Sequence, residues 1–470
     1  MGLAGFDARA GVTAAPARHG PLPIAFDEAV VEAGGSGLAV GIAPANARRP
    51  VWTYWVPLLC MLSPERLEAV PVAAAAASAR PFVYPVELRS EVVEWCAQNG
   101  ERESVVVLPP EVGRAARTGH AIVLVSLMHE SRVLFAPASG AFTLFDALAR
   151  IADEYDLAPA QLWFVHGDDG AAGQLAAWLK ARRRAIAPFT ARECEPFSAF
   201  VGACARECVE RGRAPDARTI FDRRDNVTIG WRQTRVGWRP RHRLLDAPPE
   251  PGAARYACLN RAFRPHRWAV LQRLFREGLL EHGLVSFPRP TDYELAKVEP
   301  ECRNGEVQAL LDLLPLSIDR AFHRDDQRYF DENADAVGLL PPVAAGSAVQ
   351  LVNETLHAGE SRFLSEKSFK GLLGWGPMVL VGNRAALARL RELGVETWPD
   401  LVDERYDEVP DPGERLDAAM TAFAELVSDA SRLEAAVTAA ADRRRLNVRW
   451  LLEARKPWDT LLDDLQDALA

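Results

Sequence analysis

The chain has 470 residues, a formal net charge of −9, 49% hydrophobic residues and 25% charged residues. At about 150 residues per domain, it is long enough for two or three domains that each bury a core. This composition excludes a long disordered chain and a membrane bundle, and the acidic balance argues against a protein that coats nucleic acid by charge alone.

The first 50 residues are rich in Gly, Ala and Pro and show no hydrophobic period, so we expect an irregular N-terminal extension over residues 1–50. Their start lacks the basic and apolar regions of a secretory signal, and the run VAAAAASA at 72–79 is far shorter than the roughly 18 apolar residues of a membrane span. The seven cysteines include no CxxC pair, which indicates reduced thiols and no structural metal site. We therefore expect a cytoplasmic protein with no membrane span.

Hydrophobic runs alternate with amphipathic stretches over residues 51–250. The β-like runs are SVVVLPP (104–110), AIVLVSLMH (121–129) and QLWFVHG (161–167), and the period of TLFDALARIADEYDL (143–157) predicts a helix between the last two. Strands that alternate with helices imply βαβ units and a largely parallel sheet. We expect a Rossmann-like N-terminal domain over residues 51–250.

Two polar features of this half each have a functional and a structural interpretation. Asp168 and Asp169 follow the third β-like run, where such a pair would suit a metal-dependent GT-A glycosyltransferase, but the GDDG segment also fits a turn that caps the next helix. Arginines alternate with Trp231 and Trp238 between residues 222 and 243, which fits binding of single-stranded nucleic acid by charge and stacking. For that stretch we favour a surface hairpin or an interdomain hinge.

The α/β alternation restarts after the Pro-rich DAPPEPG segment and predicts a second Rossmann-like domain over residues 251–410. Strands are expected at ARYACLN (254–260), AVQLVNE (348–354) and PMVLVG (377–382), each followed by a helix. The sequence DPGE from residue 411 supplies a helix cap and a Pro at the first helical position, so we expect a helical tail over residues 411–470. The predicted fold class is α/β, with two Rossmann-like domains and a C-terminal helical tail.

Cationic residues crowd the end of the strand at 254–260 and the first turn of the helix that follows. The segment contains Asn260, Arg261, Arg264, His266 and Arg267. Cations at a helix N-terminus oppose the helix dipole, so this placement makes sense where an anion binds. Backbone N–H groups and Arg side chains then form a phosphate site at the carboxyl end of a strand. A solvated Arg-rich turn is the alternative.

A second polar loop follows the strand that ends near Asn353, and the next helix opens with Ser365, Glu366 and Lys367. A glutamate at this position can accept hydrogen bonds from the two vicinal hydroxyls of a ribose, and a lysine offers a point charge to a pyrophosphate. We expect a nucleotide to lie across the two helix starts. An ordinary capped helix with an exposed charge pair is the alternative.

These segments resemble the donor-binding region of the α1,3/α1,4-fucosyltransferase family, whose signature is an FENS-like strand end followed by Thr-Glu-Lys. Here the matching stretches are VNET and SEK, and the later DERYD is similar to the DESYD-like stretch of bacterial and phage relatives, so the resemblance covers residues 255–415. It implies phosphate contacts for Arg267 and Lys367 and a ribose contact for Glu366. Glu354 stands at the position of the family's Asn, and Phe363 at that of its aromatic residue.

The resemblance also implies a GT-B architecture, in which two Rossmann-like domains face each other across a cleft, with the donor in the second and the acceptor mainly in the first. It implies an inverting transfer, in which a base deprotonates the acceptor hydroxyl and cations stabilise the leaving nucleoside diphosphate. We expect the base at the end of the run at 121–129, with Glu130 as first candidate and His129 as second. The scheme needs no tightly bound cofactor; a divalent metal is compatible with it but not required.

We therefore predict an inverting glycosyltransferase that uses a nucleotide sugar, with a GDP-sugar favoured by the resemblance. Its acceptor is a hydroxyl of a glycan, a lipid-linked sugar or a modified DNA base. The alternatives are a nucleotide- or sugar-binding protein of the same fold without turnover, and a metal-dependent GT-A transferase that uses the GDDG segment.

Overall fold

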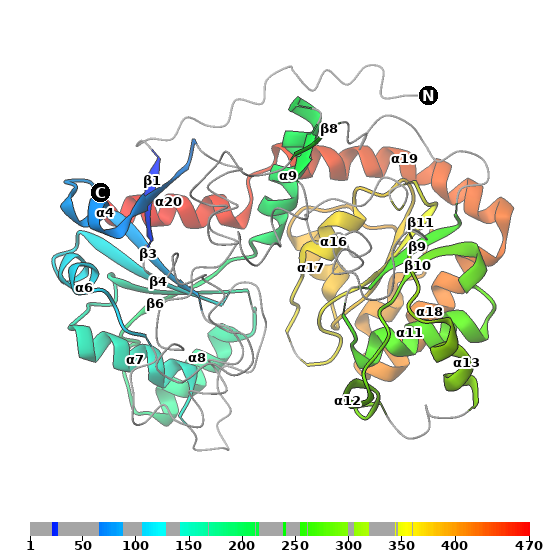
Figure 1. Ribbon diagram of the computed structural model, residues 1–470, viewed down its shortest axis with the longest axis horizontal. Helices are drawn as coiled ribbons and strands as arrows, with labels where there is room; N and C mark the ends of the chain where they lie inside the picture. The colour runs from blue at the N-terminus through cyan, green and yellow to red at the C-terminus, as the bar shows by residue number, and fades with distance from the viewer. Residues whose placement is uncertain are drawn as a thin grey trace. The chain divides into compact units, whose positions relative to one another are not determined.

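The computed structural model describes residues 21–26, 65–87, 106–127, 142–167, 169–211, 213–215, 238–240, 254–260, 262–298, 305–318, 344, 346–359 and 361–470. The described residues of Thr13–Ala203 and Arg455–Ala470 form one compact unit, and those of Cys204–Arg218 and Trp238–Ala454 form another. We call them the six-stranded unit and the four-stranded unit after their main sheets (Figure 1). The domain boundaries expected at residues 50, 250 and 410 stay predictions.

The six-stranded unit is built on a parallel sheet with the strand order β2-β1-β3-β4-β5-β6. Every residue of β4 is buried, as expected for a strand covered on both faces. The strands are β1 (Leu22–Phe26), β2 (Leu67–Pro71), β3 (Phe82–Glu87), β4 (Ala121–Leu127), β5 (Leu162–His166) and β6 (Thr190–Glu193). The helices are α4 (Val72–Ala77), α6 (Pro110–Arg117), α7 (Leu144–Tyr155), α8 (Ala171–Ala181), the first half of α9 (Phe197–Arg211) and α20 (Pro457–Leu469).

Two segments of this unit differ from the sequence-based expectation. β1 lies inside the stretch 1–50 that we expect to be irregular, because its five residues LPIAF are too few to show a period. Residues 106–109 form no strand, although SVVVLPP predicts one. Pro109 and Pro110 lack the N–H group that strand pairing needs, and Pro110 instead begins α6, where a missing N–H costs nothing.

The four-stranded unit is built on a second parallel sheet, with the strand order β10-β9-β11-β12. The strands are β9 (Tyr256–Leu259), β10 (Gly283–Ser286), β11 (Val349–Asn353) and β12 (Met378–Val381), and β7 (Arg213–Pro215) pairs with β8 (Trp238–Pro240) in a separate antiparallel ribbon. The helices are α11 (Pro265–Arg276), α12 (Asp292–Leu295), α13 (Gly305–Leu313), α16 (Glu366–Gly371), α17 (Ala386–Glu392), α18 (Pro412–Ser428) and α19 (Ala430–Glu453), with 3-10 turns at Leu280–His282 and Glu404–Glu408.

The C-terminal helices divide between the two units. α18 and α19 belong to the four-stranded unit, whereas α20 belongs to the six-stranded unit. Trp458 and Leu461 of α20 are buried, and Asp463 accepts a hydrogen bond from Arg66 at 2.6 Å. α9 also runs from one unit into the other, so the chain passes between the units within α9 and again between α19 and α20.

The strand order of each sheet contains one topological switch point. In the four-stranded sheet, β9 is followed in sequence by β10 on one side, and the chain then returns to place β11 on the other side. Since parallel crossovers are right-handed, connections that leave in opposite directions lie on opposite faces and leave a crevice at the carboxyl ends of the two central strands. The crevice of this sheet therefore lies between the ends of β9 and β11.

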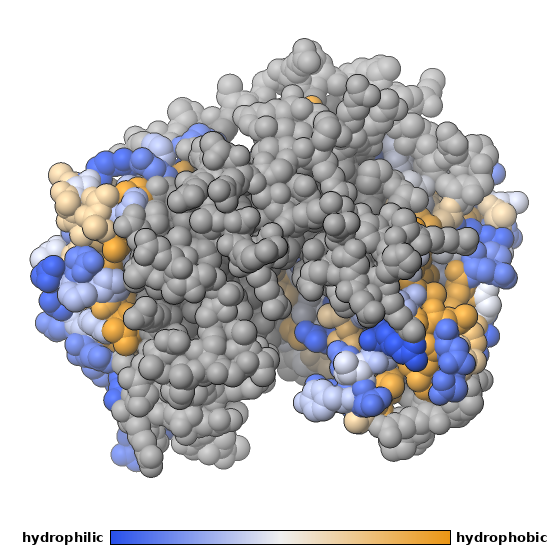
Figure 2. Space-filling view, viewed as in Figure 1, coloured by the Kyte–Doolittle hydropathy of each residue, from blue (hydrophilic) through white to orange (hydrophobic). Residues whose placement is uncertain are grey.

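Two parallel α/β sheets and a set of C-terminal helices confirm the predicted fold class. No helix in the described part of the chain combines the length and apolar character needed to cross a membrane. Hydrophilic and hydrophobic residues are interspersed on the described surface in Figure 2. Within the described ranges, the exposed large apolar side chains come from separate segments, namely Val107, Ile186, Tyr293, Leu313 and Leu446.

Candidate functional site

Two asparagines mark the ends of β9 and β11 at the switch point. The side-chain amide of Asn353 donates to Asn260 Oδ1 at 3.0 Å, and the amide of Asn260 donates to the carbonyl of Ser286, which ends β10, at 3.3 Å. Both amides also lie near the sulfur of Cys258, at 3.4 Å for Asn260 and 3.3 Å for Asn353. These buried contacts join the carboxyl ends of three neighbouring strands, so both predicted asparagines have a positioning role here.

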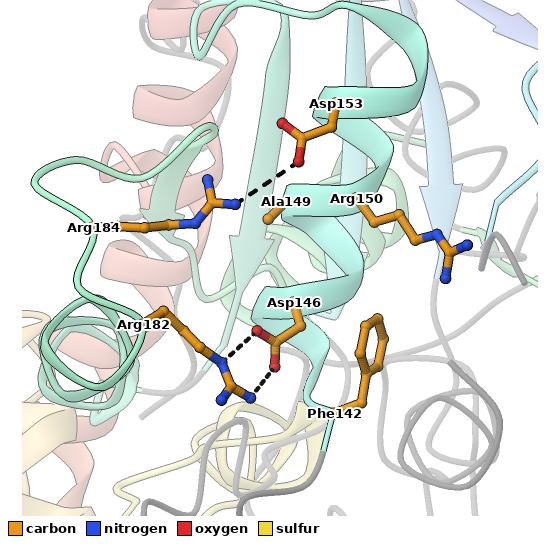
Figure 3. A pocket seen from close by; sticks show the side chains of 7 residues that line it. All are labelled: Phe142, Asp146, Ala149, Arg150, Asp153, Arg182 and Arg184. Atoms are coloured by element: carbon orange, nitrogen blue, oxygen red, sulfur yellow. Dashed lines mark hydrogen bonds and ion pairs between the residues drawn. The ribbon is translucent and has the colours of Figure 1, made fainter. Parts of the chain in front are cut away.

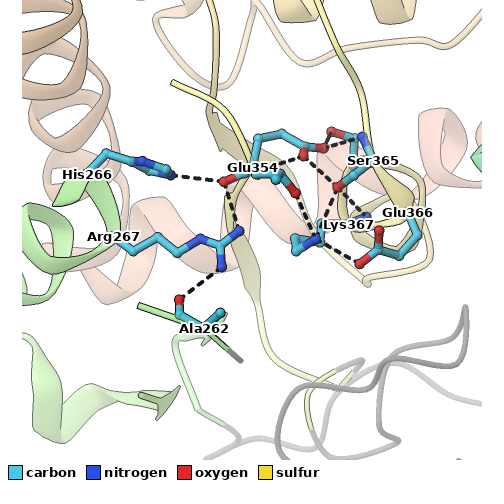
Figure 4. Close-up of polar contacts among 9 residues, drawn as sticks. Ala262, His266, Arg267, Glu354, Ser365, Glu366 and Lys367 are labelled. Carbon is cyan, nitrogen blue, oxygen red and sulfur yellow. Dashed lines mark hydrogen bonds and ion pairs between the residues drawn. The ribbon is translucent and has the colours of Figure 1, made fainter. Parts of the chain in front are cut away.

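Glu354 is fully buried and its carboxylate organises the loop that follows β11 (Figure 4). Oε1 accepts from the Ser365 N–H at 2.9 Å and from the Ser368 hydroxyl at 2.6 Å. Oε2 accepts from the Thr355 N–H at 2.9 Å and from the Ser365 hydroxyl at 2.5 Å. Because these bonds occupy both oxygens, Glu354 holds the start of α16 in place instead of presenting its carboxylate to a ligand.

The backbone carbonyl of Glu354 accepts hydrogen bonds from two side chains of the first turn of α11 (Figure 4). His266 Nε2 lies 2.9 Å from this oxygen and an Arg267 guanidinium nitrogen 3.0 Å from it, and Arg267 also donates to the carbonyl of Ala262 at 3.1 Å. Arg267 is only 3% exposed, and burial lowers the pKa of its guanidinium to about 10. Arg267 thus joins the loop after β9 to the loop after β11. Because its guanidinium is buried, its charge contributes to the electrostatic potential of the site without contact with solvent.

Glu366 and Lys367 form a close ion pair at the start of α16. Lys367 Nζ lies 2.8 Å from Glu366 Oε1, and the side chains are 17% exposed for Glu366 and 23% exposed for Lys367. Burial raises the pKa of the Glu366 carboxyl, but Lys367 and Lys370 outweigh this effect and lower it to about 2. Burial lowers the pKa of the Lys367 ammonium, an effect that Glu366 opposes. Lys367 Nζ also donates to the hydroxyls of Thr355 and Ser365, at 3.3 and 3.2 Å, so its three N–H groups are engaged. The pair therefore offers an ionised acceptor beside a cation that acts on a ligand through its charge.

The two helix starts predicted to bind a nucleotide differ in their capping. The α16 helix has six residues, and Ser365 caps it by accepting from the Lys367 N–H at 3.4 Å. The twelve-residue α11 helix begins with Pro265 and has no side-chain cap. The N–H groups of its first turn have no partner within the helix, so they remain available to an anion.

The cationic side chains around the α11 start also differ in their surroundings. The Arg264 side chain is exposed and donates to the neighbouring carbonyl of Phe263 at 3.2 Å, so its charge faces solvent at the edge of the crevice. Arg261 lies outside the described residues. Phe363, expected to contact the donor, is 2% exposed and packs in the interior. Arg264 and Lys367 are thus the described cations of this edge that reach the surface.

Three side chains that the sequence analysis did not single out complete the loop after β11. Arg415, from α18, donates to the carbonyls of His357 and Gly382, and Asn383 donates to the carbonyl of Ala358 at 3.1 Å. The His357 ring stacks on that of His266, with centroids 5.2 Å apart. These contacts join residues that are far apart in the sequence, so no local signal reveals them.

The DERYD stretch has a structural role in the four-stranded unit. The Asp407 carboxylate accepts from the N–H groups of Leu387 and Ala388, at 3.1 and 3.0 Å, and so caps α17. Glu404 accepts from the N–H of Trp398 at 2.6 Å. Burial raises the pKa of both carboxyls. Both carboxylates therefore bind backbone groups of the protein itself.

The remaining predicted site residues lie in the other half of the sequence. The candidate bases His129 and Glu130, as well as Asp168, are outside the described residues. The Arg/Trp stretch between residues 222 and 243 also lies outside them, except for Trp238–Pro240, which form β8. Among the residues that the structure describes, no group of three or more His, Cys, Asp or Glu side chains is arranged to hold a metal ion.

An open pocket of about 330 Å³ lies in the six-stranded unit beside α7 (Figure 3). Arg182 donates to both carboxylate oxygens of Asp146, at 2.8 and 2.9 Å, and Arg184 lies 3.8 Å from Asp153. Asp146 also accepts from Trp178 at 2.9 Å and caps α7. These pairs fasten α8 and the segment after it to α7, and the pocket contains none of the predicted site residues.

No family model matches the chain, and no curated protein matches it. Among solved structures, the chain is similar to the DNA-modifying enzyme beta-glucosyltransferase, with a TM-score of 0.38 and 8% identity over 95% of this chain and 99% of that chain. It is also similar to T4 phage BGT in complex with UDP-glucose, with a TM-score of 0.37 and 8% identity over 96% of this chain and 99% of that chain. At these TM-scores the likeness carries no argument about the chain.

Proposed function

We propose that this protein is a glycosyltransferase that binds a nucleoside-diphosphate sugar at the carboxyl edge of the four-stranded sheet. The observation that carries this proposal is the uncapped start of α11 at the switch point between β9 and β11, with Arg264 and Lys367 beside it. Unbonded N–H groups, the positive end of the helix dipole and two surface cations together suit a diphosphate.

The ion pair of α16 supports a nucleotide as the carrier of that diphosphate. Because the pKa of Glu366 is about 2, its carboxylate is ionised at neutral pH and can only accept hydrogen bonds. A ribose offers two neighbouring hydroxyl donors to such an acceptor. Lys367, 2.8 Å away, contributes its charge to the phosphate side, so one helix start contacts both parts of a nucleotide.

In the proposed reaction, an acceptor hydroxyl attacks the anomeric carbon of the sugar. The bond from this carbon to the diphosphate oxygen breaks, its electron pair leaves with the diphosphate, and a base takes the hydroxyl proton. Arg264, Lys367 and the α11 N–H groups stabilise the charge that grows on the leaving group. Asn260, Asn353, Glu354, Ser365 and Arg267 hold these groups in position.

The finer parts of the proposal rest on the resemblance to the α1,3/α1,4-fucosyltransferase family. They are an inverting transfer, a GDP-sugar as donor, two domains that face each other across a cleft, and Glu130 or His129 as the base. The acceptor is a hydroxyl of a glycan, a lipid-linked sugar or a modified DNA base. No tightly bound cofactor is part of the proposal.

The proposal is tested by the thermal stability of the purified protein with GDP, UDP, CMP, dTDP and ADP, with and without magnesium or manganese. A nucleotide at a hundred times its dissociation constant should stabilise the protein by about 2.7 kcal/mol. We expect Lys367→Ala and Glu366→Gln to lose this stabilisation, and Lys297→Ala, a change of an exposed lysine in the same unit, to keep it. A wild-type protein that no nucleotide stabilises contradicts the proposal.

A second measurement separates a transferase from a binding protein without turnover. Release of nucleoside diphosphate from the stabilising nucleotide sugar that depends on an added acceptor, together with sugar on that acceptor, reports the reaction itself. Turnover that Glu130→Gln abolishes supports Glu130 as the base, and turnover that only His129→Ala abolishes favours the histidine. Nucleotide binding without turnover on any acceptor supports the binding protein.

A further inference from the structure

The His266 ring at the start of α11 has a fixed orientation. Its Nε2 lies 2.9 Å from the carbonyl oxygen of Glu354, and the ring stacks on His357 with an interplanar angle of 19°. A carbonyl oxygen can only accept, so Nε2 must carry the hydrogen of this bond. In the neutral ring, Nδ1 is then an acceptor with a free lone pair.

The surroundings of His266 keep the ring neutral. Burial lowers the pKa of His266 to about 3, with further contributions from Arg267, His357 and Arg264, while the bond to the Glu354 carbonyl opposes this shift. Burial and the α18 cation Arg415 lower the pKa of His357 to about 4, so the stacked partner is neutral as well. On α16, Glu366 and Lys367 are engaged with each other. At physiological pH, Nδ1 of His266 therefore accepts hydrogen bonds and does not donate them.

No hydrogen bond engages His266 Nδ1 within the described part of the chain, and the residue is partly exposed. His266 is the second residue of α11, so its ring stands beside the unbonded N–H groups that suit a diphosphate. The oxygens of an ionised phosphate are acceptors, and a second acceptor facing them gains nothing. The ligand group that fits Nδ1 must be a donor close to the phosphates.

We propose that His266 is a specificity-determining contact of the donor site, where Nδ1 accepts a hydrogen bond from a hydroxyl of the transferred sugar. The inference rests on the proposed function, because the hydroxyls nearest to the diphosphate of a nucleotide sugar, other than those of the ribose, belong to the sugar. His266 is held ready by the Glu354 carbonyl, and Glu354 is itself fixed by Ser365 and Ser368. The acceptor is thus oriented before the ligand arrives.

The test compares the affinity of a bare nucleotide with that of its sugar-bearing form by calorimetry, for GDP against GDP-fucose and GDP-mannose and for UDP against UDP-glucose. His266→Gln keeps a side-chain N–H near the Glu354 carbonyl but removes the Nδ1 acceptor. His266→Asn places an amide oxygen close to the position of Nδ1. His282→Gln, in the same unit and 37% exposed, is the control.

We expect His266→Gln to lower the ratio of the two affinities by about 2- to 12-fold, the effect of one neutral hydrogen bond. The affinity for the bare nucleotide should stay within about twofold, and His266→Asn should restore part of the ratio. The wild-type affinity for the sugar-bearing nucleotide should be constant between about pH 5.5 and 8, because His266 does not titrate there and the diphosphate of a nucleotide sugar, unlike the terminal phosphate of a bare nucleotide, has no group that titrates in this range.

Three results overturn the inference while the proposed function stands: a ratio that His266→Gln leaves unchanged, an equal loss for the bare nucleotide, or a wild-type affinity for the sugar-bearing nucleotide that falls as the pH rises above about 6.5 and no longer does so in His266→Gln. The second result makes His266 a phosphate or loop contact, and the third makes it a cation. A wild-type protein that binds none of these nucleotides overturns the proposed function, and the inference with it.

Discussion

Replacing Glu354 by glutamine should destabilise the four-stranded unit, because both carboxylate oxygens face backbone donors. Oε1 accepts from the Ser365 N–H and Oε2 from the Thr355 N–H, so either orientation of a glutamine amide sets its NH₂ group against an N–H. One backbone bond is then lost, one buried N–H is left unsatisfied, and the other bonds lose their charge. A bond to a charged group contributes about 1.5–3 kcal/mol and a neutral one about 0.5–1.5 kcal/mol, so we expect a loss of about 2–4 kcal/mol.

The assay is urea unfolding at pH 7, followed by circular dichroism, with Glu434→Gln on the exposed face of α19 as the control. The two units need not unfold together, so the loss should appear in the transition that belongs to the four-stranded unit. The control should change stability by less than about 0.5 kcal/mol. A Glu354→Gln protein as stable as this control would refute the view that the carboxylate organises the loop.

Two further predictions concern acid stability and close packing. His357 has a folded-state pKa of about 4 against 6.5 in the unfolded chain, so its stabilising contribution is complete above 6.5 and is lost as the pH falls through this range. His357→Gln should therefore reduce the decline in unfolding free energy between pH 7 and pH 5 by about 1–2 kcal/mol, measured by urea titrations at both pH values, and an equal decline in both proteins would contradict this. A Cβ on Gly376 would lie 1.7 Å from the carbonyl oxygen of Ala348, so Gly376→Ala should cost about 3 kcal/mol or more and lower the melting temperature. Gly173→Ala, where a Cβ meets open space, is the matched control, and equal melting temperatures would show that the backbone at Gly376 shifts freely.

The position of the candidate site can be predicted from the sequence, because the ends of strands are marked by local sequence patterns. The hydrophobic runs that end at Asn260 and Asn353 predict two strands, and polar loops after them predict the edge at which ligands bind. The order of the strands is not local. Without the placement of β10 on the far side of β9, the crevice between β9 and β11 cannot be distinguished from other strand ends.

The roles of single residues in the site are harder to predict. Glu354 and Arg267 are of residue types that often bind ligands, yet in the structure they join loops. Their partners include backbone groups, which no sequence motif encodes. His357 and Arg415 are absent from the sequence-based prediction for the same reason. Their contacts with His266 and with the loop carbonyls bridge segments that only the folded sheet brings together.

The place of α20 affects how the protein can be made. This helix follows the four-stranded unit in the sequence, yet its buried Trp458 and its Asp463, bonded to Arg66, belong to the unit that contains β1 to β6. A ribosome must therefore synthesise the whole four-stranded unit before the six-stranded unit receives its last helix. Until then the surface that α20 covers is open, and a message truncated before the codons of α20 would impair a unit whose strands are encoded far upstream.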